Sequence, residues 1–122
     1  MKIPGPDHPI AIEPNPNRVR VTMGGTVLVD TTRALTLREA SMQPVLYLPR
    51  EDAVMALFER TARVTHCPYK GDASYYTLQA GEQRAENAVW SYEAPFPAMS
   101  AIAGHLAFYP GRVEITETPA DG

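Results

Sequence analysis

The sequence predicts a single, mostly β domain built as a sandwich or an open barrel. Apolar residues make up 44% of the 122 residues and charged residues 20%, a balance that supports one folded core. Short runs in which apolar and polar residues alternate recur along the chain, with glycine- or proline-containing turns between them. Only one segment, residues 51–59, has the apolar spacing of a helix.

The first 17 residues are predicted to form an extended arm. Five of the 12 prolines lie in this segment: Pro4, Pro6, Pro9, Pro14 and Pro16. Proline lacks the backbone N–H and clashes with the preceding turn, so the arm cannot be helical and is expected to be partly polyproline-like. The β domain is expected to span residues 18–118, and residues 119–122 are expected to be a frayed tail.

Alternation of apolar and polar residues predicts the strands of the first half. Val19, Val21 and Met23 alternate with polar residues, which is typical of a half-buried strand. Gly24 and Gly25 follow and predict a tight hairpin to the next strand. The strands expected in this half cover residues 18–23, 26–30, 35–38 and 45–48.

One short helix is predicted from residue 51 to residue 59. Pro49 precedes acidic residues, which are favourable at the positive end of a helix dipole. Val54, Leu57 and Phe58 then fall at helical spacing. Beyond this helix the β pattern returns. The elements expected there are strands at 63–66, 73–79 and 86–92, one helical turn within 98–104, and a last hairpin of 105–109 with 112–118.

Composition excludes several classes of function. The net charge of −3, from 11 basic and 14 acidic residues, argues against a general nucleic-acid-binding surface. The single cysteine excludes an internal disulfide. No apolar stretch is long enough for a signal peptide or a membrane span, so we expect a cytoplasmic protein without a membrane partner. The glycine-rich loops of nucleotide-binding proteins and the Gly-x-Ser-x-Gly pattern of hydrolases are absent.

The segment from Thr65 to Gly71 is the predicted functional centre. Cys67 ends a predicted strand, and Lys70 follows three residues later, where a cation favours the reactive thiolate form of a cysteine. His66 points away from Cys67 in a strand, so Lys70 is the better catalytic partner. The plainer interpretation is a hairpin turn with a small buried cysteine, since proline and glycine are typical turn residues.

Aromatic residues crowd the second half of the chain. They are Tyr69, Tyr75, Tyr76, Trp90, Tyr92 and Tyr109. Packing within the sheet explains such enrichment without any function. Because side chains alternate between the faces of a strand, at most three or four of them can line one cleft. Such a cleft would bind a planar or cationic small molecule by stacking.

Charged residues form a third group of candidates. Arg33, Glu39, Arg50 and Asp52 lie in the first half, with Tyr47 among them. Most charge runs are solvated surface, but Arg33 or Arg50 together with Lys70 could hold a carboxylate or phosphate.

A metal site is not expected. His8, His66 and His105 are widely spaced, and with one cysteine they would all have to converge to bind zinc. No cofactor is predicted either.

The motif Thr65-x-Cys-Pro-Tyr-Lys-Gly-x-Ala-Ser-Tyr-Tyr76 resembles the bacterial family named domain of unknown function 427. The resemblance extends from about residue 7 to residue 116. Supporting pieces are Asp7-His-Pro-Ile10, Arg18-Val-Arg-Val21, Tyr47-x-Pro-Arg-x-Asp52 and Trp90-x-Tyr-x-x-Pro95. The resemblance implies a β-tent, or Mss4-like, fold in which two antiparallel sheets face each other, as in B-type methionine sulfoxide reductases and the ligand-binding domain of cereblon.

Two properties linked to this family or its fold relatives do not carry over. Many proteins of that fold hold zinc through paired Cys-x-x-Cys motifs, which this sequence lacks. The family is also sometimes labelled a nucleotidyltransferase, but the usual Gly-Ser and Asp-x-Asp pattern is not found here.

Three interpretations of function remain. The first is a small-molecule-binding protein with an aromatic cleft around the motif. Its expected ligand-binding residues are Thr65, Tyr69, Tyr75, Trp90, Tyr92, Arg33, Arg50 and Glu39. The second is a cysteine-dependent redox or transfer enzyme that uses Cys67 and Lys70. The third is a structural or partner-binding role, in which the proline-rich arm serves a homodimer.

Overall fold

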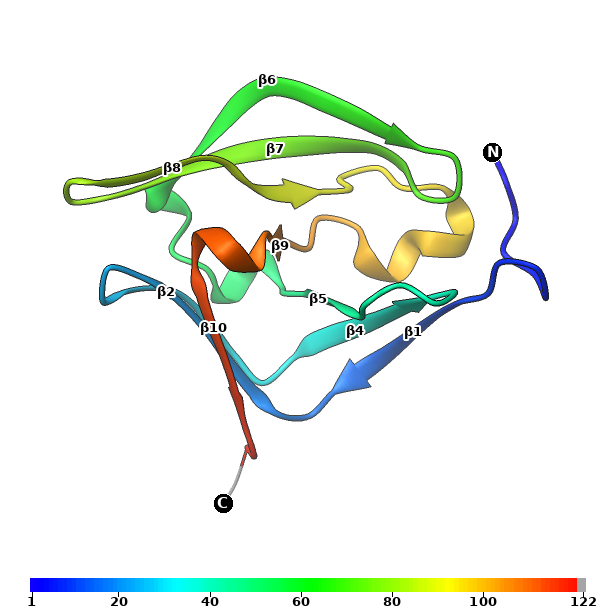
Figure 1. Ribbon diagram of the computed structural model, residues 1–122, viewed down its shortest axis with the longest axis horizontal. Helices are drawn as coiled ribbons and strands as arrows, with labels where there is room; N and C mark the ends of the chain where they lie inside the picture. Colours follow the sequence, from blue (N-terminus) through cyan, green and yellow to red (C-terminus); the bar gives the residue numbers. More distant parts are fainter. Residues whose placement is uncertain (121–122) are drawn as a thin grey trace.

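The computed structural model describes residues 1–120, in which ten strands form three antiparallel sheets (Figure 1). The sheet orders are β1-β4-β5, β10-β2-β3 and β6-β7-β8-β9. The strands are β1 Ile10–Asn15, β2 Arg18–Met23, β3 Thr26–Thr31, β4 Ala34–Glu39, β5 Val45–Tyr47, β6 Phe58–Cys67, β7 Gly71–Ala80, β8 Gln83–Ser91, β9 Ala107–Phe108 and β10 Glu114–Thr118. The mostly β, antiparallel prediction is confirmed, whereas the expected number of two sheets is corrected to three.

A bend between β3 and β4 creates the additional sheet. At this bend the Thr31 hydroxyl accepts a hydrogen bond from the Arg33 N–H at 2.9 Å and donates one to the Asp52 carboxylate at 2.7 Å. The bend turns the chain away from β3, so β4 pairs with β1 instead of continuing the first hairpin. In Figure 1 the four-stranded sheet lies above the other two sheets, which meet at an angle below it.

The predicted helix at 51–59 is wrong. Two short 3-10 turns stand there instead, η1 Arg50–Asp52 and η2 Met55–Leu57, and Phe58 already begins β6. Ala53 between the turns is extended and bridges Val29 of β3. The Val54 N–H donates to the Leu28 carbonyl at 2.9 Å, so strand pairing takes a donor that a continuous helix would need.

The N-terminal segment begins with a turn bridged between Gly5 and His8, and part of it belongs to a sheet. Residues 10–15 pair with β4 as an edge strand, where Pro14 is tolerated because one side of that strand has no neighbour. At the other end of the chain, β10 reaches Thr118. Of the predicted frayed tail, residues 121–122 lie outside the described residues, and Pro119 and Ala120 have no regular structure.

The expected hairpin of residues 105–118 does not form. β9 pairs with β8 and β10 pairs with β2, so these two strands belong to different sheets. The 3-10 turn η4, Pro110–Arg112, carries the chain from one sheet to the other. The expected helical turn before β9 is present as a 3-10 segment, η3 Pro97–Ile102.

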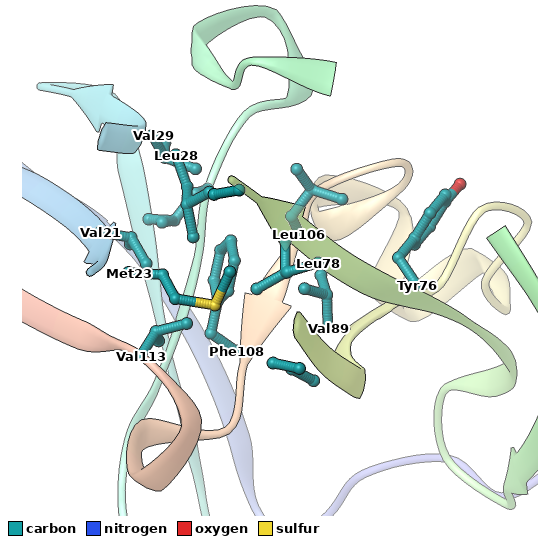
Figure 2. Packing of buried hydrophobic residues seen from close by; sticks show 14 of the residues in the cluster. Val21, Met23, Leu28, Val29, Tyr76, Leu78, Val89, Leu106, Phe108 and Val113 are labelled. Atoms are coloured by element: carbon teal, nitrogen blue, oxygen red, sulfur yellow. The ribbon is translucent and has the colours of Figure 1, made fainter. Parts of the chain in front are cut away.

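Two apolar clusters fill the space between the sheets. The first packs Val21, Leu28, Leu78, Leu106 and Phe108, with their neighbours, between β2, β3, β7 and β9 (Figure 2). The second lies between β4 and β5 on one side and β7 and β8 on the other, and it is rich in tyrosine. Among residues 1–120, no helix is long and apolar enough to cross a membrane.

Candidate functional site

A cavity of about 280 Å³ opens within the tyrosine-rich cluster. β4 and β5 contribute one wall, β7 and β8 the other, and the turn after β6 contributes a lysine. Its lining residues are Leu37, Glu39, Val45, Tyr47, Lys70, Tyr75, Trp90, Tyr92 and Tyr109. We call this space the inner cavity.

The predicted motif forms the turn that brings Lys70 to the inner cavity. The Lys70 N–H donates to the Cys67 carbonyl at 3.3 Å, and Gly71 takes a φ of +110°, which favours glycine. The Phe96 N–H donates to the Lys70 carbonyl at 3.0 Å. A Cβ at Gly71 would lie 3.6 Å from the backbone of residues 95 and 96, so the turn packs closely against that loop.

Lys70 is held by a buried ion pair. Its side chain is 8% exposed, and its Nζ lies 2.5 Å from Oε1 of Glu39, which is 12% exposed. The other carboxylate oxygen of Glu39 lies 2.7 Å from Nε2 of His8. Burial raises the pKa of Glu39, but the hydrogen bonds from Lys70 and His8 outweigh it and hold the pKa below its usual value. The carboxylate therefore stays ionised and compensates the lysine.

Two tyrosines that line the inner cavity keep their hydroxyls protonated. Burial raises the pKa of Tyr47 to about 12, and burial also raises the pKa of Tyr92. Tyr47 accepts a hydrogen bond from the Trp90 indole N–H at 3.2 Å, which leaves its own proton free to donate. Among residues 1–120 the Tyr92 hydroxyl has no hydrogen-bond partner, although the residue is only 8% exposed.

Tyr75 and Tyr109 also line the inner cavity. The Tyr75 hydroxyl lies 2.9 Å from the Thr65 hydroxyl, and the guanidinium of Arg63 stands 4.8 Å from the centre of the Tyr75 ring. Burial raises the pKa of Tyr75, but hydrogen bonding and the Arg63 charge outweigh it and lower the pKa. Tyr109 is 39% exposed and tilts over Trp90 with 4.7 Å between ring centres.

The structure brings half of the predicted site residues into one place. Glu39, Lys70, Tyr75, Trp90 and Tyr92 all line the inner cavity. Thr65 contacts its wall through Tyr75, and the Cys67 sulfur lies 3.8 Å from the Lys70 nitrogen without lining the cavity. Tyr69 lies outside it, stacked on His8 with 4.2 Å between ring centres.

The two predicted arginines do not join Lys70. Arg33 pairs with Asp52 at 3.1 Å beside the β3–β4 bend. Arg50 donates to Tyr76, to Glu93 and to the Gly104 carbonyl, all away from the inner cavity. The charged group therefore divides into separate structural ion pairs, because each arginine lies nearer to a carboxylate of its own surroundings.

The three histidines also lie in three separate places. His8 bonds Glu39, His66 bonds Asp72 at 2.8 Å on the outer face of β6 and β7, and His105 bonds the Ala103 carbonyl. Residues 1–120 contain no group of three or more His, Cys, Asp or Glu side chains placed to hold a metal ion.

Sequence reasoning missed part of the cavity. Tyr47 was named only as a neighbour of the charged residues, and Tyr109 was one of the six aromatics but not an expected ligand-binding residue. Leu37 and Val45 were assigned only to predicted strands. Alternation places Val45 and Tyr47 on one face of β5, but it does not reveal that this face meets β8. Val45 and Trp90 also line an adjoining apolar cavity of about 280 Å³, which Leu46, Phe108 and Ile115 help to form.

Comparison with known proteins identifies the family of this chain. No curated protein matches the chain. The profile of a protein family described as a domain of unknown function (DUF427) matches residues 11–118, which covers all ten strands except the first residue of β1. The chain therefore belongs to the DUF427 family.

Proposed function

We propose that this protein binds a small, planar, polar molecule in the inner cavity. The Tyr92 hydroxyl carries this proposal, because the residue lines the cavity, forms no hydrogen bond within residues 1–120, and keeps its hydroxyl oxygen accessible. Because this hydroxyl is accessible from the cavity, its proton can be donated to water or to a bound molecule. An acceptor atom of a bound molecule supplies the missing partner.

Two further hydrogen-bond donors, Tyr47 and Lys70, restrict the class of ligand that the inner cavity can bind. Tyr47 has a free proton, and the Lys70 ammonium has three protons but contacts only Glu39 and Cys67. Three donors that face one cavity favour a ligand with carbonyl or other acceptor oxygens. The aromatic faces of Trp90 and Tyr109 favour a planar ligand.

Trp90 provides a direct assay, because it is the single tryptophan of the chain and lines the inner cavity. Compounds from four classes are titrated against Trp90 fluorescence and thermal stability: nucleobases, nucleotides, sugars and aromatic carboxylates. At least one planar, acceptor-bearing compound is expected to change the Trp90 emission and to raise the melting temperature. If no compound of any class does either, the proposal is wrong.

A pair of tyrosine variants locates the binding. Tyr92→Phe removes the unpaired hydroxyl and is expected to weaken the binding of the compound found above by roughly tenfold or more. Tyr69→Phe makes the same chemical change outside the cavity and should leave affinity unchanged. Equal affinities for the two variants would mean that the Tyr92 hydroxyl does not contact the ligand.

A second candidate function is a cysteine-dependent enzyme. The observation in its favour is the 3.8 Å separation between the Cys67 sulfur and the Lys70 nitrogen, since a neighbouring cation favours the thiolate. The test is thiol labelling of the folded protein as a function of pH, with Lys70→Met as the comparison. Fast labelling near neutral pH that Lys70→Met abolishes supports the enzyme. Labelling only in denaturant rejects it.

A further inference from the structure

Two arginines differ from the other seven of the chain. Arg18, Arg20, Arg33, Arg38, Arg50, Arg60 and Arg84 each lie within 4 Å of a carboxylate oxygen. Among residues 1–120, Arg63 and Arg112 have no such partner, and both line one cavity of about 590 Å³. We call this space the outer cavity. Its remaining lining consists of Glu86, Asn87 and the turn that starts at Tyr109.

Both guanidinium groups are positioned although their charges are not compensated. Arg63 lies where β6 loses register with β7, and its guanidinium stands 4.8 Å from the centre of the Tyr75 ring. Arg112 ends η4 and donates a hydrogen bond to the backbone carbonyl of Glu86 at 3.2 Å. Neither contact neutralises charge, so most of the guanidinium N–H groups remain available. Glu86 is the one carboxylate that lines this cavity, which leaves a net charge of +1 from two arginines and one glutamate.

The outer cavity adjoins the inner cavity. Tyr109 lines both spaces. Tyr75 lines the inner cavity, and its ring also contacts the Arg63 guanidinium, 4.8 Å from the ring centre. The two cavities therefore share Tyr109, and Arg63 also contacts a lining residue of the inner cavity, so one small molecule with a short linker can be placed in both.

We propose that Arg63 and Arg112 bind an oxyanion, a phosphate or a carboxylate, of the same ligand whose planar part occupies the inner cavity. This inference rests on the function proposed above and adds the ionic class of the ligand. The fork of a guanidinium group matches the oxygens of both anions. Within residues 1–120, no other arginines line one cavity together without a carboxylate partner, and this cavity shares Tyr109 with the inner cavity.

The test compares three probes that share one ring and differ in one group: benzyl phosphate, phenylacetate and benzyl alcohol. Each is titrated against Trp90 fluorescence at low ionic strength. We expect the two anions to bind roughly tenfold tighter than the alcohol, because a charged hydrogen bond contributes more than a neutral one. Whichever of the two anions binds more tightly indicates whether the ligand carries a phosphate or a carboxylate.

Three charge-matched variants locate the anion. Arg63→Gln and Arg112→Gln are surface changes that should fold normally, and each should remove most of the preference for the anions. Arg84→Gln removes the same charge at a position that lines none of the cavities described here, so it should keep the preference. Far-ultraviolet circular dichroism checks the fold of each variant.

The outcomes separate this inference from the proposed function. If the alcohol binds as tightly as the anions, the oxyanion site is wrong while binding in the inner cavity stands. If the preference for anions survives both arginine variants but is lost in Tyr92→Phe, the anion lies in the inner cavity and the inference is overturned. If none of the three probes changes Trp90 fluorescence, both proposals fail for ring-bearing ligands.

Discussion

A pair of tyrosine-to-phenylalanine substitutions separates a hydroxyl that stabilises the fold from one that is free for a ligand. Tyr76 and Tyr92 are 5% and 8% exposed, so both rings are buried to a similar degree. The Tyr76 hydroxyl donates to Glu93 at 2.7 Å and accepts from Arg50 at 3.0 Å. The Tyr92 hydroxyl has no partner among residues 1–120. The same chemical change should therefore have different effects at the two positions.

The size of the difference follows from these contacts. A hydrogen bond to a charged group contributes about 1.5–3 kcal/mol. Arg50 and Glu93 remain paired at 3.1 Å after Tyr76→Phe, so part of their interaction survives and the expected loss is about 2 kcal/mol. Tyr92→Phe removes a hydroxyl that gains no bond from burial, so the free energy of unfolding should stay unchanged or rise by up to about 1 kcal/mol.

Urea unfolding followed by circular dichroism measures both variants against the unsubstituted protein. The two variants should differ by about 2 kcal/mol in the free energy of unfolding at equal slope. A loss for Tyr92→Phe as large as that for Tyr76→Phe would refute the reasoning, because it would mean that the Tyr92 hydroxyl forms a structural hydrogen bond. A stable Tyr92→Phe protein that also loses ligand affinity would support a binding role.

Three further predictions concern the motif and its ion pair. Lys70→Met leaves Glu39 buried without its main partner and should cost about 3 kcal/mol of stability in urea unfolding, much of which Glu39→Gln in the same chain should restore. The pKa of Glu39 lies below the usual 4.5, so the stability that its carboxylate contributes is present above that pH and is lost as the pH falls through the folded pKa. Glu39→Gln should accordingly flatten the acid loss of stability below pH 4.5, and an unchanged acid profile would contradict this. Gly71→Ala should lose about 1 kcal/mol or more in thermal unfolding because of the φ of +110°, whereas Gly111→Ala, which meets no atom within 4 Å, should be nearly neutral.

Several strands, one turn and the motif could be predicted from the sequence alone. Alternation at Val19, Val21 and Met23 predicted β2, and Gly24-Gly25 predicted the turn after it. Alternation also placed Tyr75 and Tyr76 on opposite faces, and each now packs in a different apolar cluster. These properties depend on neighbouring residues and on the period of a strand, so a one-dimensional pattern contains them.

Tertiary structure decided which elements meet. The helix expected at 51–59 failed because the backbone of Ala53 and Val54 pairs with β3, a contact that helical spacing cannot reveal. The hairpin expected at the C-terminal end failed because β9 and β10 join different sheets. Both errors have one cause: pairing between distant strands overrode a local preference.

In the candidate site, too, some features could be predicted from the sequence and others depend on how distant elements pack. The motif around Cys67 and Lys70 could be read from the chain, and so could the tyrosines that surround it. Which arginine lies near Lys70, which tyrosine lacks a partner and which cavity holds two uncompensated arginines depend on long-range packing. Ion pairing depends on a few ångströms between residues far apart in sequence. The sequence therefore pointed to Arg33 and Arg50, each of which the fold pairs with a carboxylate, and not to Arg63, which has no such partner among residues 1–120.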